Sequence, residues 1–167
     1  FVWKSRAVTV ECWLLVDSAD VRNSWLFYTA DADSADRLSA HVPWSDKVLS
    51  FDYGRFGAGG RVQTDFGPYI GKWTHVALVS NGRDFKAIYL NGRLVTSSGI
   101  AKRPLWPRKG LVIGGGRGTP LFKGKLTEFR VWNTARGEAA IRENMFRRIG
   151  GPRSGLVGCW PLNGGAD

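Results

Sequence analysis

The chain has 167 residues, with 24 lysines and arginines against 14 aspartates and glutamates, which gives a formal net charge of +10. Its 22 glycines and eight tryptophans exceed ordinary usage and favour Gly-rich turns between aromatic strands, as in an all-β domain. No apolar run approaches the roughly 18 residues that a transmembrane helix needs, so we expect no membrane insertion.

Short runs of strand-forming residues follow one another along the chain, separated by turn residues about every ten positions, a spacing typical of a sandwich or jelly roll. In chain order these runs are Val8–Val16, Trp25–Ala30, Leu38–Val42, Val48–Tyr53, Thr74–Ser80, Phe85–Leu90, Leu111–Ile113, Leu126–Trp132 and Leu156–Leu162. The length fits one domain over residues 1–167. We therefore predict an all-β protein, a two-sheet antiparallel β-sandwich with one short helix.

The centre of the chain predicts an antiparallel meander. Asn81-Gly82-Arg83-Asp84 and Asn91-Gly92 are turn sequences, because Asn and Gly tolerate the positive φ that a tight hairpin needs. The second turn leads into a further strand at Leu94–Thr96.

The one predicted helix covers Glu138–Arg148. Its apolar stripe consists of Ile141, Met145 and Ile149. Its opposite face carries two i,i+4 pairs, Glu138 with Arg142 and Glu143 with Arg147. Gly150-Gly151-Pro152 ends the helix.

The two cysteines, Cys12 and Cys159, lie in the first and last strand-like runs. Two interpretations remain open. Both can be buried thiols that act as small hydrophobic residues, or they can form one disulfide. The disulfide requires that the first and last strands are neighbours and that the protein resides in an oxidising compartment.

Asp31, Asp33 and Asp36 lie in one loop. Carboxylates at such spacing can converge on Ca²⁺, the only cofactor that the sequence suggests. The loop lacks the Gly and the bidentate Glu of the twelve-residue calcium loop, so a solvated acidic turn is the alternative. No Cys/His cluster has the spacing of zinc ligands.

The positive charge favours an anionic partner. The densest basic group runs from Lys102 to Lys109 around Trp106, and an aromatic ring among basic residues suits an acidic glycan or a nucleic acid. The alternative is a solvated surface. Because the other basic residues are scattered along the chain, we do not expect a nucleic-acid partner.

Several segments carry a family resemblance. The order VTVECWL, GKWTHVALV with IYLNGRLV, GKLTEFRVWNTAR, a short helix and GLVGCWPLN resembles the laminin-G-like, concanavalin A-like jelly-roll domains over nearly the whole chain. RLSAHVPWSDKVLSFDYG resembles a bacterial branch of that superfamily. The resemblance implies two packed antiparallel sheets with both chain ends in one sheet, a non-catalytic role in binding glycan or protein, and calcium in some members.

Side-chain alternation assigns faces to two hairpins. If Trp44–Lys47 turns the chain, Leu38 pairs with Tyr53, and the apolar residues of both strands share one face. His41 and Asp52 then lie on the opposite face. In the central hairpin the residues that point inward are Val76, Leu78, Ile88 and Leu90, whereas His75 and Tyr89 point away from the core.

We expect these outward residues to line a groove, since a sugar needs planar hydrogen-bonding groups and a ring to stack on. The predicted groove residues are His41, Asp52, His75 and Tyr89, with Trp44, Arg61 and Trp106 at its edges. The alternative is an ordinary polar outer face.

Catalytic motifs are missing from the sequence. It contains no Glu-x-Asp-x-x-Glu run of a glucanase and no Gly-x-Ser-x-Gly elbow, so we expect no enzyme. The predicted function is a carbohydrate-binding module for an acidic or sulfated polysaccharide, secreted or at the cell surface, within a larger multidomain protein. A protein-binding or structural adhesion domain without sugar binding is the alternative.

Overall fold

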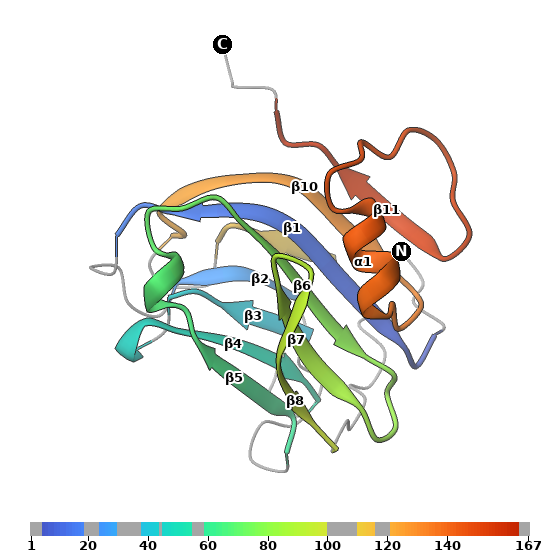
Figure 1. Ribbon diagram of the computed structural model, residues 1–167, viewed down its shortest axis with the longest axis horizontal. Coiled ribbons are helices and arrows are strands. Elements are labelled where there is room, and N and C mark those ends of the chain that lie inside the picture. Colours follow the sequence, from blue (N-terminus) through green and yellow to red (C-terminus); the bar gives the residue numbers. More distant parts are fainter. Residues whose placement is uncertain are drawn as a thin grey trace.

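Two antiparallel sheets face each other in the computed structural model, which describes residues 5–18, 24–29, 38–43, 45–54, 59–99, 110–115 and 121–163 (Figure 1). The first sheet contains, in spatial order, β11 (Leu156–Trp160), β10 (Gly124–Trp132), β1 (Val8–Val16), β6 (Thr74–Ser80), β7 (Lys86–Leu90) and β8 (Arg93–Ser98). The second contains β5 (Arg61–Asp65), β4 (Val48–Tyr53), β3 (Leu38–His41), β2 (Trp25–Thr29) and β9 (Leu111–Ile113). The sandwich prediction is confirmed, with β1 and β11 in the same sheet.

The turns between β6, β7 and β8 follow the predicted chemistry. The side-chain carbonyl oxygen of Asn81 accepts hydrogen bonds from the backbone N–H groups of Arg83, Asp84 and Phe85. Gly82 has φ +69°, and a Cβ there would lie 2.1 Å from the carbonyl oxygen of Arg6. Only glycine fits this position, because both the backbone angle and the close approach exclude a side chain.

The core lies between the two sheets, where the predicted faces meet. Leu38 pairs with Tyr53 and Ala40 with Phe51, as the alternation predicts. The interior cluster also contains the four residues predicted to point inward from the central hairpin, Val76, Leu78, Ile88 and Leu90. The register of the first hairpin and the inward faces of both hairpins are therefore confirmed.

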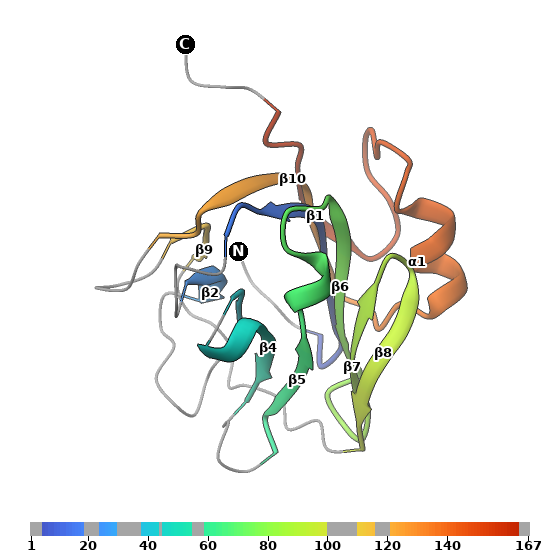
Figure 2. The same ribbon diagram turned by 60° about the vertical axis from the view of Figure 1, so that its left-hand side comes forward.

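A second, smaller core lies on the other side of the six-stranded sheet, under α1 (Glu138–Asn144). In Figure 2, α1 lies on the side of this sheet that faces away from β4 and β5. Ile141 is fully buried there against Ala77 and Tyr89, which stabilises the docked helix by about 2 kcal/mol. The helix is shorter than predicted, because it ends at Asn144 instead of Arg148. None of the helices in the described ranges is long and apolar enough to cross a membrane.

Candidate binding site

His41, Asp52 and Arg61 meet on the outer face of the five-stranded sheet. The Arg61 guanidinium binds the Asp52 carboxylate with two hydrogen bonds, Nε to Oδ1 at 2.5 Å and Nη2 to Oδ2 at 2.8 Å. His41 Nε2 lies 3.4 Å from Asp52 Oδ2, and the His41 ring packs against Trp25 at a tilt of 43°, with 3.9 Å between ring centroids. The sequence prediction therefore brought together three residues that are in contact.

Burial limits what this cluster can do. Asp52 is 0% and His41 1% exposed, whereas the Arg61 side chain is 18% exposed. Burial acts to raise the pKa of Asp52, but the hydrogen bonds from Arg61 and then His41 outweigh it and hold this pKa well below its usual range. Asp52 is therefore an ionised anchor for Arg61, and Arg61 is the member of the trio that reaches solvent.

His75 and Tyr89 do not join that cluster, so the prediction that all four residues line one groove is wrong. β6 and β7 belong to the six-stranded sheet, and its outer face is covered by α1. His75 packs edge-on against Trp13, with 5.4 Å between ring centroids, and Tyr89 packs in the small core with Ile141. Burial, then the charges of Arg130 and Arg136, lower the pKa of His75 to about 3, so His75 is neutral at physiological pH.

Five predicted residues lie outside the described residues: Trp44, Trp106, Asp31, Asp33 and Asp36. Within the described ranges, no group of three His, Cys, Asp or Glu side chains could hold a metal ion. The calcium loop and the two tryptophan positions stay predictions.

Cys12 and Cys159 are free thiols, so the disulfide interpretation is wrong. β10 lies between β1 and β11. Arg130 of β10 pairs with Glu11 on one side and with Cys159 on the other, and directly paired residues share a face. Cys12, next to Glu11, points to the opposite face and belongs to the interior cluster. The two sulfur atoms therefore lie on opposite faces of the sheet, on strands separated by β10. A disulfide bond needs its two cysteines closer together and pointing toward each other.

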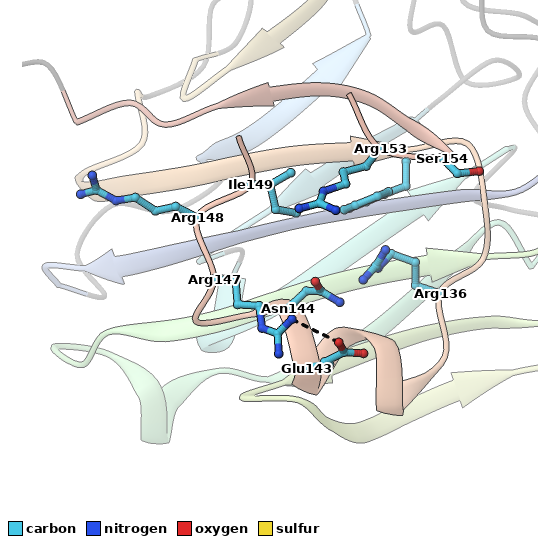
Figure 3. Close-up of a pocket in the computed structure, with 9 residues that line it drawn as sticks. Arg136, Glu143, Asn144, Arg147, Arg148, Ile149, Arg153 and Ser154 are labelled. Atoms are coloured by element: carbon cyan, nitrogen blue, oxygen red, sulfur yellow. Dashed lines mark ion pairs between the residues drawn. The ribbon is translucent and has the colours of Figure 1, made fainter. Parts of the chain in front are cut away.

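A pocket of about 300 Å³ opens beside α1, over the six-stranded sheet (Figure 3). It is lined by Trp132, Arg136, Glu143, Asn144, Arg147, Arg148, Ile149, Arg153 and Ser154. In Figure 3 the side chains of Arg136, Asn144 and Arg153 surround one space, whereas the guanidinium of Arg148 extends away from it. Four arginines against one glutamate make this pocket strongly basic.

The floor of this arginine pocket is a buried network of charges. Trp132 is 3% exposed, and its indole N–H donates to Glu11 at 2.9 Å. The Arg136 guanidinium lies 3.9 Å above the Trp132 ring, a cation–π contact. Burial raises the pKa of Glu11, while Arg136 leads the groups that oppose this rise.

Arg130 fixes the wall of the pocket. It is 1% exposed and donates to the Glu128 carboxylate and to the backbone carbonyls of Asn144 and Arg147. These carbonyls belong to the end of α1 and the segment after it, so a buried side chain of β10 holds in place the backbone that carries Arg147.

Sequence reasoning missed the arginine pocket. It placed Arg147 in a surface ion pair, which is correct, since Arg147 Nη1 lies 3.3 Å from Glu143. It assigned the densest positive charge to residues 102–109 instead. The available signal was a set of arginines clustered in the segment around the helix: Arg136, Arg142, Arg147, Arg148 and Arg153.

Comparison with known proteins identifies a family. A laminin-G family model, described as the concanavalin A-like lectin/glucanases superfamily, matches residues 1–142. The comparison with curated proteins gave no match.

Solved structures share the fold. A candidate carbohydrate binding protein from Bacteroides ovatus superposes with a TM-score of 0.77 at 23% identity, over 98% of this chain and 47% of its own. A second similar structure is domain 4 of an extracellular arabinanase from Geobacillus stearothermophilus, solved in complex with arabinotriose. It superposes with a TM-score of 0.60 at 19% sequence identity, over 83% of this chain and 66% of the arabinanase chain. A heptameric SAP-like pentraxin from Limulus polyphemus superposes with a TM-score of 0.59 at 21% sequence identity. The match covers 83% of this chain and 69% of the pentraxin chain. The chain thus spans less than half the length of the Bacteroides protein.

Proposed function

Because the chain belongs to the concanavalin A-like lectin/glucanases superfamily, we propose that it is a non-catalytic carbohydrate-binding module. The family match over residues 1–142 is the observation that carries this proposal. The names of two similar structures, a candidate carbohydrate binding protein and an arabinanase domain in complex with arabinotriose, support it.

The surroundings of the strand carboxylates support a non-catalytic role. A glycosidase needs one carboxylic acid that can give up a proton and a second carboxylate facing the same bond. Here Asp52 is held by Arg61, Glu11 by Trp132, and Glu128 by Arg130, while Asp65 at the end of β5 accepts the backbone N–H of Gly67. A carboxylate with such partners is an anchor for them and is not placed to act on a sugar.

The net charge of +10 supports an acidic or sulfated glycan as the ligand. We place the module outside the cell, secreted or at the cell surface, within a larger multidomain protein. Trp44, Trp106 and Arg61 remain the predicted contacts, with the rings as stacking platforms and Arg61 as a donor to sugar oxygens.

A glycan array with matched neutral and sulfated oligosaccharides tests the proposal. We expect binding to at least one glycan, stronger for sulfated forms and weakened by salt. Replacing Trp44 or Trp106 by Ala is expected to weaken binding with little change in melting temperature. An array without any bound glycan would instead favour the protein-binding adhesion domain, and a large loss of stability in the Trp variants would place those rings in the core.

A further inference from the structure

The arginine pocket holds more positive charge than its neighbours neutralise. Glu143, the only acidic residue among its lining residues, is already paired with Arg147. No hydrogen bond or ion pair joins the Arg153 guanidinium to any residue in the described part of the chain. The Arg136 guanidinium donates through Nη2 to the carbonyl of Ala140 at 2.8 Å, but its buried Nε has no hydrogen-bond partner among the described residues. Buried donors normally have partners, so Arg136 Nε is an unsatisfied donor of the pocket, and the exposed Arg153 guanidinium beside it is available to an acceptor from outside the chain.

We propose that the arginine pocket binds the anionic group of an acidic glycan, a sulfate or a carboxylate, an inference that rests on the proposed function. A guanidinium presents its N–H donors as a planar fork that matches both groups, and such charge-assisted bonds are the strong ones. Arg153 and Arg136 approach one space from different segments, which suits an oxyanion with several acceptor oxygens.

Polar side chains beside the arginines can form hydrogen bonds with the uncharged hydroxyl groups of the sugar. The Asn144 amide nitrogen donates to the carbonyl of Ala140 at 2.9 Å, which leaves its oxygen as an acceptor. The exposed hydroxyl of Ser154 lies on the rim. The pocket therefore combines donors for a charged group with an acceptor for a sugar hydroxyl, and its volume lies at the lower end of the range for ligand pockets.

The pocket is formed before any ligand arrives. Arg130 ties the carbonyls of Asn144 and Arg147 to β10, and the stacking of Arg136 on Trp132 fixes a second guanidinium. A site whose walls are already ordered loses less conformational entropy on binding.

Two nearby arginines have a structural role, since each binds partners within the chain. Arg130 binds Glu128 and two carbonyls, and the exposed Arg142 pairs with Glu138 at 3.7 Å. Arg153 differs from both, since it lines the pocket without such a partner among the described residues.

Calorimetric titration of two charge-matched double variants tests the assignment. Arg147→Ala/Arg153→Ala removes two guanidinium groups from the pocket, and Arg83→Ala/Lys125→Ala removes two exposed charges that do not line it. The probes are dextran sulfate, polygalacturonate and unsulfated dextran, so that sulfate and carboxylate are tested separately. We expect the pocket variant to lose about tenfold or more in affinity for the preferred charged polymer, and the control variant less than about twofold.

Conservative substitution adds a second readout. Arg153→Lys keeps the charge but removes the planar fork, so an intermediate affinity is expected. Melting temperatures close to that of the parent chain are expected for all these exposed substitutions. A titration of the isotope-labelled protein with inorganic sulfate is expected to shift the Nε–Hε resonance of Arg153, which Arg153→Lys identifies by removing it.

The outcomes separate the two proposals. Equal losses in both double variants mean that net charge alone drives binding, which overturns the pocket assignment and leaves the glycan-binding function standing. Sulfate-induced shifts without binding of any polymer or array glycan keep the anion pocket and overturn the glycan function. Binding of a glycan with neither a pocket-specific loss nor a sulfate shift overturns the pocket assignment alone.

Discussion

At the scale of single residues, the two cysteines differ in accessibility. Burial, and then the nearby charge of Glu11, raise the pKa of the Cys12 thiol far above its ordinary value, and burial also raises that of the half-buried Cys159. Because the thiolate is the reactive form, the two thiols should react at different rates.

A chromogenic disulfide reagent measures the accessible thiols. In the native protein we expect one thiol, that of Cys159, to react slowly, and in the denatured, unreduced protein we expect both thiols to react. Cys159→Ser should abolish the native reaction and leave one thiol after denaturation. Finding no thiol in the denatured, unreduced parent chain would contradict the separation of the two sulfur atoms.

The faces of single residues were predictable only in part. Alternation correctly assigned Leu38 and Val76 to the interior. It also assigned His41 and His75 to outer faces, but polar alternation does not reveal that an outer face is covered. In the six-stranded sheet α1 supplies that cover, through a contact between segments far apart in the sequence.

At the scale of elements, Arg130 connects β10 to the end of α1. Arg130→Met is expected to destabilise the protein by about 3–5 kcal/mol, because the change leaves buried carboxylate and carbonyl groups without their donor. Urea unfolding measures this loss, and hydrogen exchange at residues 144–149 should speed up in the same variant.

A double-mutant cycle with Glu11→Gln provides the control. Arg130 Nη1 lies 3.6 Å from Glu11 Oε1, so removing the carboxylate charge should recover part of the loss in Arg130→Met. A loss below about 1 kcal/mol in the single variant, or strictly additive effects in the double variant, would contradict this role.

Most elements could be predicted because strands that face the core alternate clearly. β5 was missed for a physical reason: it is an edge strand, and Val62 is the only buried residue among Arg61–Asp65. The end of α1 was misplaced because the helical stripe continues to Ile149, whereas Arg130 captures the carbonyls of Asn144 and Arg147. The cluster of arginines could be read from the sequence, but their arrangement around one pocket could not, since its walls meet only after the helix has docked on the sheet.

At the scale of the whole molecule, Lys86 connects the two sheets at one edge of the sandwich. Its side chain is 0% exposed, and Nζ donates to the carbonyl of Gly59, two residues before β5, at 2.9 Å. Burial lowers the pKa of Lys86 from its ordinary 10.5 to about 8, although the charge of Asp52 opposes this shift. Between these two values the unfolded chain holds a proton that the folded chain has released, so stability rises with pH there.

The free energy of unfolding of the parent chain, compared with that of Lys86→Met, should therefore increase from pH 8 to pH 10.5 and stay level below pH 8. Chemical denaturation at intervals of half a pH unit measures the difference, and other titrating groups cancel in it. A difference independent of pH over that range would mean that Lys86 titrates normally in the folded protein.

The family match ends at residue 142, one position before Glu143, the first of the pocket residues beyond the matched part. Of the described residues 143–155, none belongs to the interior cluster between the sheets. The sandwich and most of the pocket wall are thus separate in sequence. Backbone carbonyls hold the wall on the scaffold: those of Asn144 and Arg147 accept from Arg130, and that of Met145 accepts from the Trp13 indole. Because backbone carbonyls make these contacts, natural variation or protein engineering can change the side chains of the segment, and with them the chemistry at the surface, while the contacts that hold it on the sheet are kept.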